Sequence, residues 1–256
     1  MRRYPALAAP LPMAIAHRGG AWEAPENSPT AFERAHTLGY RYFETDVRAT
    51  ADDVALAFHD ADLGRVTGRS ISLREVPWSL VQTIKIHGVE PIMRLDDLLD
   101  TYQDTVFNVD VKEKEAIEPF VKAVRSVGAA DRVVVASFSH RRLRQVRRLM
   151  GPTLASSLSP QEVWALYRLA QGKSSRWSPQ DLACVQVPET FGGRHLVTPA
   201  FVQTVHKLGL QVHVWTINDE TSMNRILDLG VDAIMTDKPP LLRQVLISRG
   251  QWHGPA

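Results

Sequence analysis

The sequence predicts a single (β/α)8 TIM barrel, an α/β fold, with a small insertion after the second strand. Two observations predict this fold: short apolar segments alternate with amphipathic segments along the chain, and the apolar segments number eight. Alternation of strands and helices is typical of a parallel sheet covered by helices, and eight repeats favour a closed barrel over an open sheet. The 256 residues match the length of one such barrel, so we expect one domain over residues 1–256.

The eight predicted strands are mostly apolar on both alternating faces, as expected where both sides of a sheet are covered. They span residues 13–17, 42–47, 106–111, 133–138, 154–158, 184–188, 212–217 and 233–237. The predicted helices span residues 30–39, 117–128, 141–150, 160–170, 200–209, 220–230 and 239–250. Several follow Pro, Ser or Asp and several end in Gly, which are helix start and stop signals. Residues from about 60 to 105 exceed one strand–helix unit, and this predicts an insertion with short helices above the barrel.

Bulk composition excludes several classes of protein. Hydrophobic residues make up 44% and charged residues 23% of the chain, which are ordinary values for a globular protein with a large core. The net charge of only +2 gives no strong electrostatic attraction to nucleic acid or to a membrane surface. No apolar run approaches the ~18 residues of a membrane span, and the N-terminal signal-like stretch runs directly into the first predicted strand. The single cysteine, Cys184, excludes an intramolecular disulfide and fits a reducing compartment. We therefore expect a cytoplasmic protein with no nucleic-acid partner and no integral membrane segment.

Polar side chains gather where the predicted strands end. Those at or near a strand end are His17, Glu44, Asp46, Asp110, Lys112, Ser137, Gln186, Trp215 and Asp237. In (β/α)8 barrels the chemistry takes place at the C-terminal ends of the strands. The positions of these residues therefore agree with the predicted fold.

Two strands carry paired charges at a spacing of two residues. Glu44 and Asp46 leave the same face of one strand, and Asp110 and Lys112 repeat this spacing on the next. Three carboxylates at a barrel mouth repel one another unless a cation lies between them, and oxygen ligands without cysteine favour Mg²⁺ or Ca²⁺ over zinc. The alternative is a set of salt bridges in which Lys112 and Arg18 neutralise the carboxylates.

Two histidines flank the carboxylate cluster in the sequence. His17 is followed directly by Arg18, whose guanidinium is suited to bidentate phosphate binding, and His59 precedes a turn. Imidazole titrates near neutral pH, so a pair of histidines can accept and return one proton. A single histidine is more often a structural residue, but two beside a carboxylate cluster favour acid–base catalysis.

Nine short motifs in this order resemble the glycerophosphodiester phosphodiesterase family. They are HRG (17–19), PEN (25–27), AF (31–32), ETDV (44–47), HD (59–60), NVDVK (108–112), SF (137–138), WTIN (215–218) and GVDAIMTDKP (230–239). The resemblance extends from residue 15 to about residue 240. That family is a (β/α)8 barrel with an insertion after the second strand, in agreement with the fold predicted from the sequence pattern.

The resemblance implies a role for each matching residue. His17 and His59 would be the acid–base pair; Glu44, Asp46 and Asp110 would bind a divalent cation; Arg18 and Lys112 would hold the phosphate oxygens; and Trp215 would line the glycerol or leaving-group pocket. Two positions depart from the family pattern. The third metal ligand is commonly Glu where this chain has Asp110, and Ser28 follows the PEN motif where Thr is usual.

The implied activity is the metal-dependent hydrolysis of a small-molecule glycerophosphodiester to sn-glycerol 3-phosphate and an alcohol. A first alternative is a lysophospholipase D with the same site, which would require an apolar groove or an exposed amphipathic edge at the barrel mouth. The apolar residues of the insertion, among them Val76, Trp78 and Ile84, could line such a groove or pack the insertion. A second alternative, a noncatalytic phosphodiester-binding barrel, would require the loss of a histidine or a ligand, and every expected position is filled.

Overall fold

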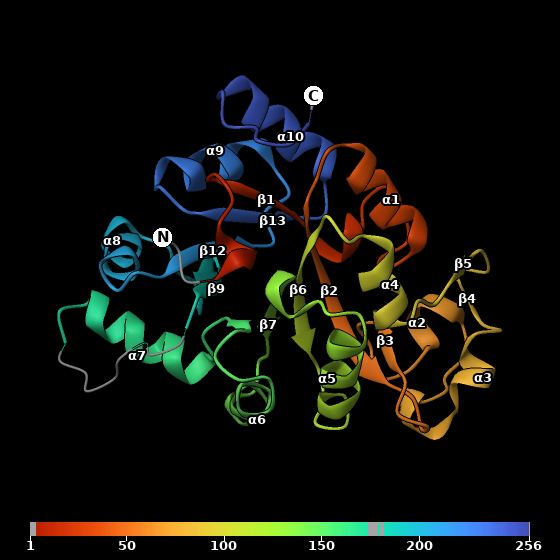
Figure 1. Cartoon of the computed structure of the whole chain (residues 1–256). Helices are drawn as coiled ribbons and strands as arrows, with labels where there is room; N and C mark the ends of the chain where they lie inside the picture. The colour runs from red at the N-terminus through yellow and green to blue at the C-terminus, as the bar shows by residue number, and fades with distance from the viewer. Residues whose placement is uncertain (1–3, 174–178, 180–181, 256) are drawn as a thin grey trace.

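Eight parallel strands form a nearly closed barrel in the computed structural model, which describes residues 4–173, 179 and 182–255 (Figure 1). The strands are β1 (Met13–Ala16), β2 (Tyr42–Ala49), β6 (Val106–Val111), β7 (Val133–Ala136), β8 (Ala155–Ser156), β9 (Cys184–Pro188), β12 (Gln211–Trp215) and β13 (Ala233–Thr236). They are ordered β8-β7-β6-β2-β1-β13-β12-β9, and a parallel bridge between Ser157 and Cys184 joins the two ends of this order. The predicted (β/α)8 barrel is confirmed.

Helices cover the outside of the barrel (Figure 1). They are α1 (Pro29–Thr37), α4 (Leu95–Thr101), α5 (Ile117–Ser126), α6 (His140–Met150), α7 (Pro160–Ala170), α8 (Pro199–Lys207), α9 (Glu220–Asp228) and α10 (Pro239–Ser248). Several begin at the side-chain caps that the sequence predicts. Ser28 accepts a hydrogen bond from the Ala31 N–H at the start of α1, and Ser159 and Glu162 form a capping box at the start of α7.

The chain between β2 and α4 departs from the strand–helix alternation. Strand β3 (Ala55–Ala57) pairs antiparallel with β2, and it is followed by α2 (Gly64–Thr67), α3 (Trp78–Val81) and the β4–β5 hairpin (Lys85–Ile86 and Glu90–Pro91). This segment has its own apolar cluster, in which Val76 and Ile84 are buried. Helix α4 packs against α5 as a member of the outer ring. The apolar residues of the insertion therefore mostly pack the insertion itself.

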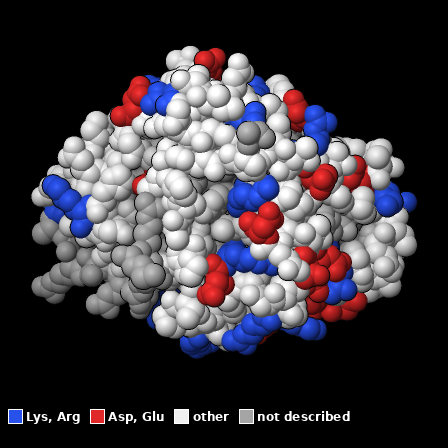
Figure 2. All heavy atoms as spheres, turned by 45° about the horizontal axis from the view of Figure 1, so that its top comes forward, with Lys and Arg blue, Asp and Glu red and all other residues white. Residues whose placement is uncertain are grey.

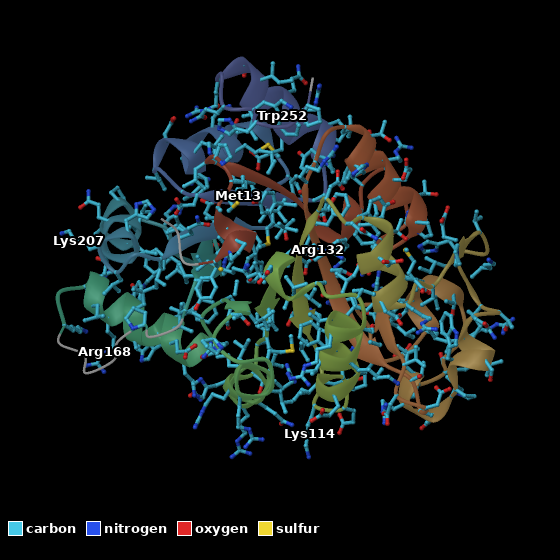
Figure 3. The ribbon with its side chains drawn as sticks, viewed as in Figure 1. Met13, Lys114, Arg132, Arg168, Lys207 and Trp252 are labelled. Atoms are coloured by element: carbon cyan, nitrogen blue, oxygen red, sulfur yellow. The ribbon has the colours of Figure 1, made fainter. Side chains whose placement is uncertain are left out.

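The barrel interior is apolar at its N-terminal end. Tyr4 and Leu7, beside and on the short 3-10 helix η1 (Pro5–Leu7), pack with Met13 of β1 and with Cys184, which is fully buried. Near this end the Arg132 guanidinium donates to main-chain carbonyls of α4 and of the α4–β6 connection (Figure 3). At the other end of the chain, Trp252 follows α10 and packs 5.3 Å from the ring of Tyr40 (Figure 3).

The molecular surface carries charges of both signs. On the face drawn in Figure 2, Lys and Arg side chains lie among Asp and Glu side chains. Within the described ranges, no helix is both long and apolar enough to cross a bilayer.

Candidate active site

The turn after β1 presents His17 and Arg18 at the C-terminal end of the barrel. Both residues belong to the short 3-10 helix η2 (His17–Gly19), and Gly20 follows with a φ of +100°. A Cβ at Gly20 would lie 2.6 Å from Cγ of Pro239, so only glycine fits this close approach. The turn also aims the Arg18 main-chain N–H at Glu44 Oε2, 3.1 Å away.

His17 is held by a carboxylate from the opposite end of the chain. Its Nδ1 lies 2.6 Å from Oδ1 of Asp237, whose Oδ2 accepts a hydrogen bond from the Asn218 amide. The other ring nitrogen, Nε2, lies 3.7 Å from Glu44. Burial alone would lower the pKa of His17, but Glu44 and Asp237 outweigh burial and raise it. The bond from Nδ1 to Asp237 thus orients the ring, so that Nε2 faces Glu44.

His59 has a matching arrangement after β3. Its Nδ1 lies 2.6 Å from Oδ1 of the neighbouring Asp60, and Asp60 Oδ2 accepts from Arg65 Nε at 2.6 Å. Both histidines therefore have Nδ1 fixed by an aspartate, which is a geometry that selects one tautomer and one ring orientation.

All the predicted site residues lie around one cavity of about 620 Å³ at the barrel mouth. Those lining it are His17, Arg18, Glu44, Asp46, His59, Asp110, Lys112 and Trp215. They come from the turn after β1, from β2, from the ends of β6 and β12, and from the segment after β3. The structure thus brings together residues that are separated by about two hundred positions in the sequence.

Lys112 lies between two of the three predicted metal ligands. Its Nζ is 2.8 Å from Asp46 Oδ1 and 2.7 Å from Asp110 Oδ2. Arg18 Nε forms an ion pair with Asp46 Oδ2 at 3.1 Å, although without the alignment of a hydrogen bond. Lys112 and Arg18 thus both form ion pairs with carboxylates, as in the salt-bridge alternative. Over the residues that the structure describes, no three His, Cys, Asp or Glu side chains are arranged to hold one metal ion.

Lys112 and Arg18 neutralise the carboxylate cluster only in part. Burial and the neighbouring Asp46 raise the pKa of Glu44 to about 7, and burial raises the pKa of Asp110 despite Lys112. Oδ1 of Asp110 is buried and has no hydrogen-bond partner among the described residues. Hard oxygen donors with uncompensated charge are suited to Mg²⁺ or Ca²⁺. The donor set of Glu44, Asp46 and Asp110 therefore fits a divalent cation, which would compete with Lys112 for the same oxygens.

A chain of ion pairs links the two halves of the site. Arg65 of α2 donates to Glu26 from Nη2 at 2.6 Å and from Nη1 at 3.0 Å, and Arg18 Nη1 donates to Glu26 Oε1 at 3.0 Å. Through Asp60, Arg65 also reaches His59. Arg65 was not predicted from the sequence, because it contacts Glu26 across 39 positions and belongs to none of the recognised motifs.

Alanine at Arg65 should lower kcat/KM on the order of 10-fold, because Asp60 and Glu26 would lose the group that fixes them beside His59 and Arg18. Lysine at this position keeps the charge but not the forked donors, and should restore only part of the activity. Steady-state kinetics with a glycerophosphodiester tests this. Unchanged kinetics in the alanine variant would show that the chain of ion pairs does not position the site.

Comparisons with known proteins show the family of this chain. The glycerophosphoryl diester phosphodiesterase family matches residues 17–241. A Mycobacterium tuberculosis protein named as a probable glycerophosphodiester phosphodiesterase 2 is 40% identical over 246 residues, which cover 94% of this chain and 93% of that protein. A glycerophosphodiester phosphodiesterase of Caldanaerobacter subterraneus is 29% identical over 245 residues, which cover 90% of this chain and 96% of the relative.

The fold is similar to a solved structure of the same class. The crystal structure of a Silicibacter pomeroyi protein named as a putative glycerophosphoryl diester phosphodiesterase superposes with a TM-score of 0.78 at 22% identity, and the match covers 96% of each chain. The match to the family extends from the first catalytic candidate, His17, to the start of α10. This chain therefore belongs to the glycerophosphoryl diester phosphodiesterase family of enzymes.

Proposed function

We propose that this enzyme hydrolyses glycerophosphodiesters of small alcohols to sn-glycerol 3-phosphate and the free alcohol, with His17 and His59 as the acid–base pair. The observation that carries the proposal is that both histidines line one cavity with the carboxylates and with Arg18 and Lys112. The 40% identity to a relative named for this activity supports the same substrate class.

The proton transfers follow from the orientation of the two imidazoles. Each ring has Nδ1 on an aspartate, so Nε2 is the nitrogen that exchanges protons with the substrate. One histidine removes the proton from the attacking hydroxyl, and an oxygen–phosphorus bond forms. The other histidine protonates the alcohol oxygen as its bond to phosphorus breaks. The attacking hydroxyl is the glycerol 2-hydroxyl, with water opening the cyclic phosphate afterwards, or water itself; either route consumes one water.

In this proposal, Arg18 and Lys112 neutralise the negative charge of the substrate phosphodiester. A phosphodiester carries one negative charge, and Arg18 and Lys112 line the cavity together with both histidines. A substrate phosphate would bind them in place of part of their present contacts to Asp46 and Asp110. Trp215 lines the cavity from the end of β12 and gives an apolar wall to the glycerol or the leaving alcohol.

Glu44, Asp46 and Asp110 would hold the divalent cation. When bound, the cation supplies Lewis-acid polarisation of the phosphoryl oxygens. With a divalent cation on Asp46 and Asp110, the Lys112 ammonium would be free to bind the substrate phosphate. Lys112 would then neutralise the carboxylates in the metal-free enzyme and the phosphate in the metal-loaded enzyme.

Removal of divalent metal should lower glycerol 3-phosphate release from glycerophosphocholine by at least ~10²-fold, and Mg²⁺ or Ca²⁺ should restore it. Metal binding should also raise stability without substrate, by about 2.7 kcal/mol at a metal concentration of one hundred times the Kd. Thermal unfolding with and without metal measures this second effect.

The variants Glu44→Gln and Asp110→Asn test the ligand assignment. Each should lose the metal-dependent rise in Tm, whereas His253→Ala, on the exposed C-terminal segment, should keep it. Full activity of metal-free protein in chelator would contradict the proposed cation requirement. No release of glycerol 3-phosphate from any glycerophosphodiester, with metal bound, would contradict the proposed function.

A further inference from the structure

Two side-chain amides form part of the floor of the cavity. Asn108 of β6 and Gln186 of β9 both line the cavity. Asn108 lies two residues before Asp110 on the same face of β6, so it is deeper in the barrel than that carboxylate. The Gln186 amide nitrogen, Nε2, donates to Asn108 Oδ1 at 2.8 Å. The mechanism proposed above uses neither amide.

A chain of hydrogen bonds runs from this floor through the barrel interior. Gln186 Nε2 lies 3.3 Å from Nδ1 of His213 on β12, and His213 Nε2 lies 3.2 Å from Oε1 of Gln211. Gln211 Nε2 donates to the main-chain carbonyl of Leu7 at 3.1 Å. His213 is 1% exposed, and Leu7 belongs to η1 at the opposite end of the barrel. The chain thus connects the cavity with the N-terminal end of the barrel.

The main-chain carbonyl at the end of this chain sets the direction of each hydrogen bond. A carbonyl only accepts, so Gln211 presents Nε2 to Leu7 and Oε1 to His213. Because Oε1 also only accepts, His213 Nε2 carries the hydrogen. Burial lowers the pKa of His213 to about 4, so the ring is neutral near pH 7 and its Nδ1 has no hydrogen. Nδ1 therefore accepts, and Gln186 must present its amide nitrogen to it.

This direction determines which amide atoms are left for the cavity. Gln186 Nε2 donates one hydrogen to His213 and the other to Asn108, so Oε1 is its remaining polar atom. Asn108 uses Oδ1 for Gln186, so its remaining polar atom is Nδ2. Within the described ranges neither atom has a hydrogen-bond partner, and neither is among the buried side-chain atoms that lack one. The floor thus presents one acceptor and one donor to the cavity.

An acceptor beside a donor is suited to a hydroxyl, because a hydroxyl both donates and accepts. A methyl group at the same place would exclude water from both amides without replacing its hydrogen bonds. Glycerol is the part of the proposed substrate that carries free hydroxyls whatever the leaving alcohol is. Its 2-hydroxyl is the attacking group in one of the two routes above, whereas its terminal hydroxyl is free in both.

We propose that Gln186 and Asn108 bind the terminal hydroxyl of the substrate glycerol and thereby select glycerol over alcohols that lack this hydroxyl. The inference rests on the phosphodiesterase activity proposed above and names residues of that site that recognise glycerol. Gln186 Oε1 accepts the hydroxyl hydrogen, and Asn108 Nδ2 donates to the hydroxyl oxygen. His213 is a positioning residue, because it contacts Gln186 and fixes the direction of its amide.

Binding of two phosphate monoesters tests the hydroxyl site without catalysis. sn-Glycerol 3-phosphate and the matching enantiomer of propane-1,2-diol 1-phosphate differ only in the terminal hydroxyl, and each is titrated into metal-loaded enzyme by calorimetry. The wild type should bind glycerol 3-phosphate on the order of 10-fold more tightly. Gln186→Met, which keeps the length of the side chain, should bind the two with Kd values within about 2-fold. The same exchange at the exposed Gln103, Gln103→Met, is the matched control and should discriminate as the wild type does.

Two variants of His213 test its positioning role. His213→Leu removes both ring nitrogens and leaves the Gln186 amide free to turn, so the ratio of the two Kd values should fall at least about 3-fold. His213→Asn keeps an acceptor near the position of Nδ1 and should retain more of the ratio. A defect that is only structural would weaken both phosphate esters equally and leave the ratio unchanged. An unchanged ratio in folded His213→Leu would therefore remove His213 from the proposal.

Turnover separates this inference from the proposed function. The ratio of kcat/KM for glycerophosphocholine to that for the phosphocholine diester of propane-1,2-diol should be on the order of 10 in the wild type and within about 2-fold of unity in Gln186→Met. Both diesters keep the 2-hydroxyl, so both routes of hydrolysis are open to them. If the wild type hydrolyses both equally well, or if Gln186→Met keeps the wild-type ratio, the hydroxyl site is wrong and the proposed function stands. If neither diester is hydrolysed with metal bound, the proposed function fails and this inference fails with it.

Discussion

Alanine at His17 or at His59 should lower kcat for glycerophosphocholine at least ~10²-fold, with little change in stability at pH 8. Each ring lines the cavity and has Nδ1 on an aspartate, so neither can be replaced by a neighbouring group in proton exchange. Steady-state kinetics measures the loss, and circular dichroism checks that the fold is kept. The exposed His253 is the control, and His253→Ala should retain wild-type kinetics.

A substrate with a nitrophenol leaving group distinguishes the roles of the two histidines. Nitrophenolate departs without a proton, so the variant that lacks the general acid should regain most of its rate with this diester. The variant that lacks the general base should remain slow with both substrates. Near-normal turnover of glycerophosphocholine by either alanine variant would remove that histidine from the mechanism.

Asp46→Ala should lower the free energy of unfolding by about 3–5 kcal/mol in metal-free protein, because it removes the buried carboxylate that two partly buried cations share. Asp46 is 1% exposed and lies 2.8 Å from Lys112 Nζ and 3.1 Å from Arg18 Nε. Urea denaturation in chelator measures the change. Asp228→Ala removes an exposed carboxylate that pairs with Arg249 at 2.7 Å, and it should cost less than about 1 kcal/mol.

The destabilisation by Asp46→Ala should depend on pH in a defined direction. Burial alone would raise the pKa of Asp46, but Lys112 and Arg18 outweigh burial and lower it. A carboxyl whose pKa is lowered by folding contributes stability above its unfolded pKa, and this contribution is lost as the pH falls through the folded pKa. The difference between wild type and variant should therefore be complete above about pH 5 and should shrink as the pH falls below about 4. A difference that grows toward low pH would contradict the assigned ion pairs.

The barrel was predictable because its signals are local. Each strand is a short apolar run, and the helix starts carry their own caps, such as Ser28 and Ser159. The site residues on β1, β2 and β6 were predictable for a related reason. Parallel strands place their C-terminal ends at one rim, so position along a strand fixes which polar side chains meet.

Other parts of the site depend on contacts that sequence spacing does not encode. Asn218 was within a recognised motif, but its hydrogen bond to Asp237 appears only when β12 and β13 are paired. Trp164 lies in a helix that the sequence predicts as amphipathic. This helix, α7, has two apolar faces, and its docking on the barrel decides which of them borders the cavity. Lys112 was expected at the phosphate, whereas the folded chain places it between Asp46 and Asp110.

The contact between His17 and Asp237 spans 220 positions, from the end of the first strand to just past the last. During translation the His17 ring is made early, but its aspartate leaves the ribosome only after nearly the whole chain has been synthesised. A prematurely terminated product that lacks residue 237 would keep most of the binding groups and lack an oriented imidazole. The orientation of the first-strand imidazole therefore depends on the segment of the chain that is synthesised almost last.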